Sequence, residues 1–450
     1  MNRRNAKELF AGVNSFMIIN SIEITGFKNI STVKINFDSL MSLVAPNGYG
    51  KSNVLNAIEF GIDFINQSAK TRDNMMRFKP CIPINKNMNN CKCNFVFNMQ
   101  DTSDASSNMV EYAFSFAWQN DQETAGNIVS ETLKIKSLKN KEVKFTNYII
   151  RNEKVALYKT SKTGRCTKKI NIKPNELVLT KLNILGDLYY SEIINKIADL
   201  TFYVEDRMDV GDCFDVPPFR NQDYVKGSLK IEDMDDIPRY IFYLKENYSE
   251  KYYRLESAFK MLFPSILNVE IRQYDVSFSS VEPIPANVPF KIDENAYKLL
   301  MVDDNMNQPI PFEYLSAGTK KVFVFLAAIL AADINKISLI AIEEIENSIH
   351  PILMKDLINI IEQFAGNTKI IITSHSPYII DCLQPSELYL PIPNDEGLAK
   401  FGNINKPRQA AKLIKDAKSN DNTIGEYIFS LLSGDKDDFE IMKSYLSVQS

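Results

Sequence analysis

One stretch, residues 41–68, restricts the fold of this chain more than any other feature. Met41–Val44 is apolar and predicts a strand, the next eight residues read APNGYGKS, and a helix is expected from Asn53 to about Ser68. The backbone N–H groups of such a loop and the positive end of the following helix attract phosphate. The stretch therefore predicts an α/β fold with a phosphate-binding loop of the Walker A type.

Each residue type in this loop has a chemical reason. Gly48 and Gly50 permit the tight backbone, Lys51 is expected to bridge the β- and γ-phosphates, and the Ser52 hydroxyl is expected to ligate Mg²⁺. The usual first glycine is Ala45 here. The alternative is a chance glycine turn before a helix, which the flanking strand and helix disfavour. The residues predicted to contact the nucleotide in this segment are Asn47, Gly48, Tyr49, Gly50, Lys51, Ser52 and Asn53.

A second apolar strand, residues 337–342, ends in two carboxylates. This is the Walker B arrangement, which places acids at the carboxyl end of a strand beside the phosphates. Glu343 is expected to hold Mg²⁺, directly or through water, and Glu344 to polarise the attacking water. The usual metal-side residue is Asp, and Glu343 is one methylene longer. Adjacent acids at a solvated strand end are the alternative, which the upstream phosphate loop disfavours.

Two further motifs accompany these. Residues 314–319, YLSAGT, precede an apolar helix and resemble the signature motif of ABC-type ATPases, in which the serine hydroxyl, the glycine N–H and the helix dipole hold the γ-phosphate of the opposite subunit. The resemblance assigns these roles to Ser316 and Gly318; the alternative is a simple helix cap. His375, in IIITSHSP, matches the switch histidine that senses the γ-phosphate, against an ordinary structural role. His350 is assigned to the acidic loop or a subunit interface.

In order, APNGYGKSN, LSAG, IEEIENSIHP and TSHSP resemble the ABC-head ATPases of the OLD, RecF and SMC type. The opening SIEITGFKNI is similar to the first strand of that family. This similarity implies that Lys28 and Asn29 lie near the nucleotide. The resemblance covers roughly residues 17–390. It implies an ATPase that uses ATP and Mg²⁺ in sites shared between two copies, with Lys51, Glu344 and His375 as its catalytic residues.

The chain is expected to divide into an ABC-like head over residues 17–390 and a C-terminal extension over 391–450. Within the head, residues 91–160 hold short strand-like runs that predict an antiparallel β lobe, and residues 174–265 predict a helical insertion. Heptad repeats are not sustained, which argues against a coiled-coil arm. Asp435-Lys-Asp437-Asp438 imitates a Toprim nuclease motif, but the preceding glutamate-bearing strand and the room for that domain are missing.

Composition excludes some classes. The net charge of −4 argues against a global field for nucleic acid, and the longest apolar run, Val322–Ala332, is too short to span a membrane. We therefore expect a cytoplasmic protein. Six scattered cysteines argue against a disulfide framework. Cys91 and Cys93 suggest buried thiols, with a zinc site as the alternative.

The chain is similar to the standalone ATPase subunits of bacterial anti-phage systems such as Septu, PARIS and certain retrons. That similarity implies an ATP-dependent homodimer or higher oligomer that gates or senses for a separate effector, such as a nuclease or toxin. The alternatives are a RecF-like DNA-processing ATPase and a scaffold that binds ATP without hydrolysing it. The basic stretches 136–144 and 159–169 leave DNA binding open, although a charge run is usually a solvated face. Gln100 is the candidate for a Q-loop glutamine.

Overall fold

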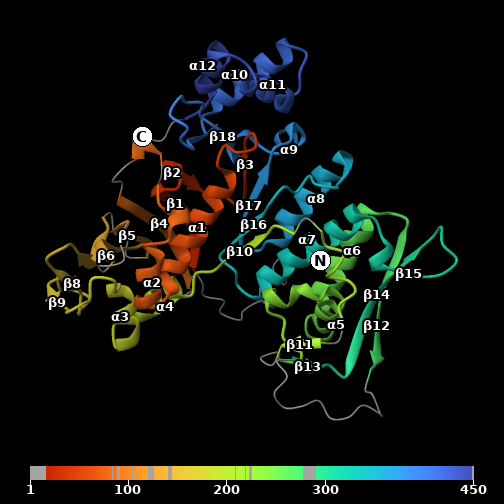
Figure 1. Cartoon of the computed structure of the whole chain (residues 1–450), viewed down its shortest axis with the longest axis horizontal. Coiled ribbons are helices and arrows are strands. Elements are labelled where there is room, and N and C mark those ends of the chain that lie inside the picture. The colour runs from red at the N-terminus through yellow and green to blue at the C-terminus, as the bar shows by residue number, and fades with distance from the viewer. Residues whose placement is uncertain are drawn as a thin grey trace. The chain divides into compact units, whose positions relative to one another are not determined.

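The computed structural model describes residues 17–83, 85–88, 92–103, 106–119, 126–139, 144–207, 209–217, 219–221, 225–276 and 290–447. These residues form two compact units (Figure 1). Unit 1 comprises residues up to Val204, Ile337–Ala341 and residues from Asn367 onward, and unit 2 comprises Glu205–Lys336 and Ile342–Gly366. No helix among the described residues is long and apolar enough to cross a membrane.

Unit 1 contains an eight-stranded sheet in the order β2-β1-β4-β5-β6-β7-β8-β9, in which every pairing that joins β1 to β9 is antiparallel. Strands β1 and β6 alternate between buried and half-buried side chains because one face of the sheet packs on the core. The strands are β1 (Met17–Phe27), β2 (Ile30–Asn36), β4 (Lys92–Ser103), β5 (Ser106–Ala117), β6 (Asn127–Ser137), β7 (Thr146–Arg151), β8 (Ala156–Tyr158) and β9 (Lys168–Lys169).

Helix α1 (Lys51–Asn66) packs on this sheet through aromatic rings. Phe64 stacks on Phe114 and Phe116 with ring centroids 4.9 Å apart in both pairs. A Cβ on Gly61 would lie 2.6 Å from the Phe95 ring, so glycine is what allows the helix to approach this closely. The C-terminal half of α1 is thereby packed closely on the aromatic side chains of the sheet.

A six-stranded sheet has the order β10-β16-β17-β3-β18-β19, and it belongs to unit 1 except for the last residues of β10 and β16. Strand β3 pairs in parallel with both β17 and β18. β3 and β16 are buried throughout, as a strand covered on both faces requires. The strands are β3 (Leu40–Val44), β10 (Phe202–Glu205), β16 (Leu339–Ile342), β17 (Lys369–Ser374), β18 (Leu388–Pro391) and β19 (Phe401–Asn403).

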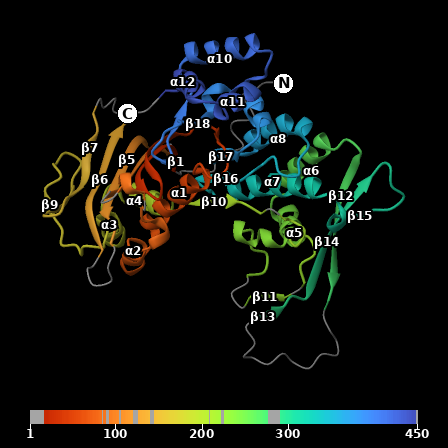
Figure 2. The same ribbon diagram turned by 45° about the horizontal axis from the view of Figure 1, so that its top comes forward.

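The remaining helices of unit 1 fall into two groups along the chain. The first group is α2 (Ala69–Met75), α3 (Val178–Leu185) and α4 (Ser191–Ala198). The second follows β17: α9 (Pro377–Cys382), then α10 (Pro407–Ser419), α11 (Ile424–Leu432) and α12 (Lys436–Tyr445), which gather at the C-terminal end of the unit (Figure 2).

Unit 2 is built around α7 (Ala317–Ile334), which is buried along most of its length, as expected for a helix that is apolar on all sides. Helices α5 (Ile237–Asn247), α6 (Ser249–Leu262) and α8 (Pro351–Phe364) complete its helical part. A three-stranded antiparallel sheet consists of β12 (Ile266–Asp275), β14 (Asn295–Asp303) and β15 (Ile310–Pro311). A two-stranded sheet consists of β11 (Phe219–Asn221) and β13 (Phe290–Ile292).

The predicted α/β class with an antiparallel β lobe is confirmed, and the longest described helix, α7, has 18 residues, so no coiled-coil arm occurs in the described part of the chain. Within residues 174–265 the structure has helices on both sides of β10 and β11, and β10 joins the six-stranded sheet. Residues 391–450 are not set apart, because they belong to unit 1 together with the phosphate loop.

Candidate nucleotide site

The predicted phosphate loop connects the end of β3 to the start of α1. Gly48 has φ 77° and Gly50 has φ 121°, both in the region that favours glycine. A Cβ on Gly50 would lie 2.8 Å from the Cβ of Ala399, whereas one on Gly48 would meet nothing within 4 Å. Gly50 is thus required by close packing behind the loop, and Gly48 faces open space.

Helix α1 begins in a way that suits an anion. Its N-cap is Gly50, no side chain caps the first turn, and no acidic residue lies in that turn. No carboxylate of the first turn therefore offsets the positive end of the helix dipole, and a helix start of this kind suits phosphate binding. Asn47 and Ser52 are exposed beside it.

The Lys51 side chain is buried in the loop, where its Nζ donates to the carbonyl oxygen of Ala45 at 2.7 Å and to that of Pro46 at 3.4 Å. A buried ammonium needs such acceptors because its desolvation is costly. Phosphate oxygens are stronger acceptors than these carbonyls because they carry charge. The arrangement is therefore suited to a lysine that moves its hydrogen bonds to a ligand.

Lys28 and Asn29 lie beside the loop. The Asn29 amide nitrogen is 3.5 Å from the carbonyl oxygen of Tyr49, and its Oδ1 accepts from the Asn53 amide at 2.8 Å. The Lys28 Nζ donates to Oδ1 of Asn56 at 2.5 Å, and Lys28 has a φ of 49°. The turn between β1 and β2 is thus tied to the first two turns of α1, and both residues are half-buried next to the loop.

Tyr49 has a role that the sequence did not reveal. Its phenol lies 2.7 Å from the carbonyl oxygen of Ile392 and 3.0 Å from that of Lys400, and its ring packs edge-on against Phe401. Burial raises the pKa of Tyr49 to about 12. The side chain is therefore directed into the β18–β19 connection, and only its backbone is left to face a phosphate. The sequence feature that could have indicated this packing role is an aromatic residue between two loop glycines.

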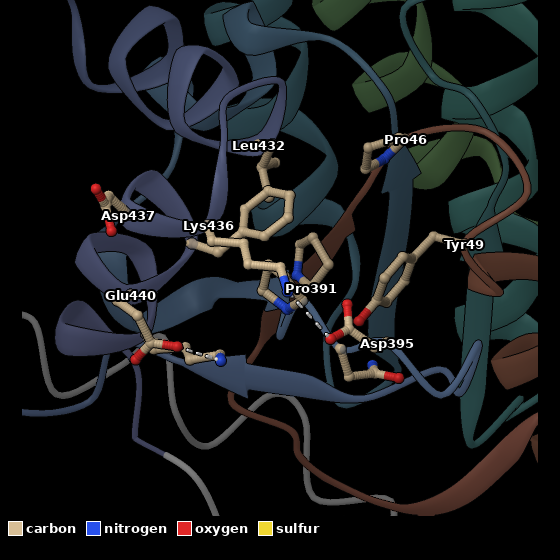
Figure 3. A pocket seen from close by; sticks show the side chains of 12 residues that line it. Pro46, Tyr49, Pro391, Asp395, Leu432, Lys436, Asp437 and Glu440 are labelled. Atoms are coloured by element: carbon tan, nitrogen blue, oxygen red, sulfur yellow. Dashed lines mark hydrogen bonds and ion pairs between the residues drawn. The ribbon is translucent and has the colours of Figure 1, made fainter.

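A cavity of about 550 Å³ lies on this side of the loop (Figure 3). Pro46 and Tyr49 line one part of it, and the β18–β19 connection and helices α11 and α12 line the rest, with Leu432 and Phe439 among the apolar side chains. The C-terminal residues thus form a wall next to the phosphate loop, which sequence analysis treated as a separate extension.

His375 follows β17, the strand that pairs with β3. Ser374 is in register with Val44, and the N–H of Ala45 donates to the carbonyl oxygen of Ser374 at 3.3 Å. His375 therefore follows a residue in direct contact with the first residue of the phosphate loop, as its predicted role requires. It is half-buried. Gln100, in contrast, lies within β4 opposite Ile18 rather than at a strand end.

In unit 2, Glu343 and Glu344 follow β16 in a tight turn. Glu344 has a φ of 48°, and its Oε2 accepts from the Asn347 amide at 2.6 Å. The N–H of Glu343 donates to the carbonyl oxygen of Glu205 at 3.0 Å. Lys321 of α7 is buried near Glu344, and burial lowers its pKa against the opposing effect of the carboxylates around it. The acidic turn and the start of α7 therefore share one electrostatic environment.

The signature segment is packed against the same turn. Ser316 caps α7, its Oγ accepting from the N–H of Thr319 at 3.2 Å, and it is exposed. A Cβ on Gly318 would lie 2.1 Å from the carbonyl oxygen of Ser348, so only glycine fits there. His350 caps α8 through Nδ1, which is 3.3 Å from the N–H of Ile352. The structure thus places His350 in the loop, as one of its two predicted roles requires.

These residues fit a nucleotide with Mg²⁺. No cluster of three or more His, Cys, Asp or Glu side chains that would hold a metal occurs among the described residues. Mg²⁺ is commonly held by one or two protein oxygens together with substrate phosphates, so a hydroxyl and a carboxylate are a sufficient protein contribution. Ser52 carries such a hydroxyl in unit 1, and Glu343 carries such a carboxylate in unit 2. Cys93 is fully buried, and Cys91 lies outside the described residues.

Comparisons with known proteins give two matches to family models. Residues 228–381 match the family described as "AAA domain, putative AbiEii toxin, Type IV TA system", and residues 17–157 match one described as "Protein of unknown function (DUF2813)". The first match supports an ATPase of the AAA class in the broad sense, with ATP binding and hydrolysis. No curated protein sequence matches this chain.

The chain is also similar to three solved SMC heads. A head bound to the C-winged helix domain of ScpA has 14% identity and a TM-score of 0.44, covering 88% of this chain and 99% of that one. A Pyrococcus furiosus head with an extended coiled coil, bound to the C-terminal domain of ScpA, has 11% identity and a TM-score of 0.43, covering 89% and 100%. The head domain from Thermotoga maritima has 11% identity and a TM-score of 0.38, covering 86% and 100%.

Proposed function

We propose that this chain is an ATPase that closes head to tail with a second copy around ATP and thereby gates a separate effector protein. The observation that carries the proposal is the phosphate loop, with Lys51 buried on its carbonyls and α1 starting without a side-chain cap or an acidic residue. A helix start of this kind binds anions because its N–H groups and dipole favour negative charge. The AAA domain match agrees with this chemistry.

Binding and hydrolysis use different residues. Lys51 and the N-terminus of α1 hold the phosphates, and Asn29 and Asn53 support the loop from the side. Ser52 and Glu343 would hold Mg²⁺, which neutralises phosphate charge when bound. Glu344 orients the attacking water and accepts its proton, and His375 senses the γ-phosphate. Strand β16, which precedes the acids, and strand β3, which precedes the loop, belong to one sheet.

Closure of two copies is supported by the exposure of the signature segment. Ser316 and the neighbouring Tyr314 are exposed, Tyr314 to 75%. Ile352, which follows the acidic loop in the same unit, is exposed to 78%. The start of α7, with Ser316 exposed at its cap, is therefore accessible to a second copy. Ser316 and Gly318 of the partner subunit would contact the γ-phosphate, so that hydrolysis removes the contacts that keep the pair closed.

The test compares Glu344→Gln with wild type and with Glu250→Gln, which alters an exposed acid on α6. Loss of a positioned base typically slows turnover about 10²- to 10⁴-fold, so Glu344→Gln should hydrolyse ATP at least about 100-fold more slowly. Light scattering should show a dimer or higher oligomer of Glu344→Gln with ATP and less of it without nucleotide. Equal turnover would remove Glu344 as the base, and an unchanged oligomeric state would refute closure around ATP.

The effector part of the proposal rests on the likeness to standalone anti-phage ATPases. The neighbouring genes test it: an adjacent nuclease or toxin gene supports a gate or sensor, and adjacent DNA-repair genes oppose it. The alternative is a RecF-like DNA-processing ATPase. In that case DNA should accelerate turnover, with a steep loss of the effect as salt rises.

A further inference from the structure

One end of the eight-stranded sheet in unit 1 concentrates positive charge. The exposed cations between residues 138 and 174 are Lys139, Lys144, Lys154, Lys162, Arg165, Lys168, Lys169 and Lys173. Within that range Glu153 is the one exposed carboxylate among the described residues. The chain as a whole carries a net charge of −4, so this concentration is local. We call these eight cations the basic edge.

The basic edge lies on a folded support. Strands β7, β8 and β9 are the last three of the sheet, and β9 pairs with β8 through Leu157 opposite Lys169 and Tyr158 opposite Lys168. The connection from β8 to β9 carries Lys162 and Arg165. Figures 1 and 2 both show β9 at the outer end of this sheet. The cations therefore lie on β9 and in the connections that join or follow the last strands of this sheet.

Neighbouring side chains hold this margin in place. Lys159 is buried with its Nζ 4.7 Å from the centre of the Tyr148 ring, and Tyr148 packs edge-on against Tyr190 at 4.9 Å. The Tyr190 phenol donates to the carbonyl oxygen of Lys159 at 3.0 Å. A cation held over an aromatic face and a tyrosine tied to the backbone fix the start of the β8–β9 connection. The charges are thus presented by an ordered hairpin.

Six of these cations have no ion pair within the part of the chain that the structure describes. No ion pair among the described residues involves Lys144, Lys154, Lys162, Arg165 or the β9 lysines. Lysines just outside the basic edge do have such pairs, as with Lys134 and Glu111 at 2.6 Å. Uncompensated like charges repel one another and contribute nothing to the stability of the fold. The basic edge therefore calls for an explanation outside folding.

Protection against aggregation explains only part of it. Lysines on an exposed edge strand prevent pairing with other chains, and this accounts for Lys168 and Lys169. It does not account for Lys139, Lys154 and Lys173, which lie in connections rather than on the edge strand. A surface that extends over several connections fits an extended anionic partner.

We propose that the basic edge binds the phosphate backbone of double-stranded DNA without reading its sequence. Duplex DNA carries one negative charge per roughly 1.7 Å of its axis, so it can meet several separated cations at once and release counterions at each. Among the described residues from 138 to 174, Phe145 is the one exposed aromatic ring, whereas single-strand binding uses several aromatic rings on which successive bases stack. Such a surface serves a DNA sensor as well as a DNA-processing enzyme, and it does not depend on the proposed ATPase.

The test uses the full chain without nucleotide and a fluorescent duplex of mixed sequence. One variant replaces Lys162, Arg165, Lys168 and Lys169 by Gln. The matched control replaces Lys406, Arg408, Lys415 and Lys418 by Gln. These are also three lysines and one arginine, and they lie at exposed positions at α10 in the same unit. Circular dichroism and ATP turnover should be unchanged in both variants.

At physiological salt each lost phosphate contact weakens binding about fivefold, so the loss of at least two should weaken it about 30-fold. The slope of log affinity against log salt should become shallower by about 2 in the β8–β9 variant and remain unchanged in the α10 control. Equal weakening in both variants would overturn the assignment to the basic edge. Binding of wild type to phosphatidylserine vesicles but not to the duplex would overturn DNA as the partner.

Discussion

The contact between the signature helix and the acidic loop gives a prediction with a calculable size. In Gly318→Ala the new Cβ would lie 2.1 Å from the carbonyl oxygen of Ser348, a separation that real side chains do not tolerate. The obstacle is backbone, so either the start of α7 or the residues after Glu344 must shift by more than 1 Å to restore ordinary contact of about 3.4 Å. Overpacking of this kind costs about 1–3 kcal/mol.

Gly211→Ala is the matched control. Its new Cβ would meet the carboxylate of Asp209 at 3.1 Å, which is the end of a flexible side chain in the same unit. Surface substitutions of this kind change stability by about 0.5 kcal/mol or less. The two variants add the same methyl group, so their difference isolates the contact with Ser348.

Hydrogen–deuterium exchange and ATP-dependent light scattering provide the measurements. In Gly318→Ala we expect faster exchange in peptides that cover residues 315–322 and 343–350. If the whole destabilisation of about 1–3 kcal/mol appears as easier local unfolding of these segments, exchange should be about five- to 150-fold faster. ATP-dependent association should fall, because Ser316 is displaced with the helix start. Exchange and association as in Gly211→Ala would refute the inference that Gly318 sets this contact.

Four further outcomes follow from the site and its surroundings. Lys51→Ala should abolish measurable ATP binding in calorimetry, whereas Lys28→Ala should weaken it only about tenfold or less, since a partly exposed charge contributes about 1 kcal/mol. Tyr49→Phe should lower the free energy of unfolding by about 1–3 kcal/mol in urea titrations, because the carbonyl oxygens of Ile392 and Lys400 lose the Tyr49 hydroxyl as their hydrogen-bond donor. Since the folded pKa of Tyr49 is raised to about 12, its stabilisation is complete below pH 10 and lost as the pH rises toward 12. Wild type should therefore lose more stability than Tyr49→Phe over that pH range. Arg72→Met should lower the free energy of unfolding by about 1–3 kcal/mol in the same titrations, because the buried Arg72 donates to oxygens of Phe64, Ile65 and Thr180 that then lose their donor.

The phosphate loop, the acidic strand end and the switch histidine were predictable because each depends on local pattern. A buried strand, a glycine turn and a helix start are neighbours in sequence, and so are an apolar run and the acids that follow it. The sequence also predicted β3 nearly to the residue and α1 to within two residues at each end, since an apolar run and helical periodicity mark them. What it could not predict is which distant segment packs on these elements.

The role of Tyr49 shows the reason. Its phenol contacts Ile392, 343 positions away along the chain, and such a contact depends on the whole fold rather than on the residues around the tyrosine. The same holds for β10 and β18, whose short runs look like loop or helix margin in isolation and become strands only because the central sheet offers them hydrogen bonds.

By itself, the sequence therefore determined the α/β class and the positions of the glycine loop, of the acids after a buried strand and of the LSAG helix start, whose binding roles stay predictions. Those features are encoded in residue chemistry and in spacing over one or two turns or strands. The tertiary structure decided that Gly318 lies against Ser348, that the C-terminal residues form a wall beside the loop, and that the basic stretch 159–169 becomes the outer margin of a sheet. Each of these depends on burying apolar surface contributed by segments far apart in the chain, which no local pattern specifies.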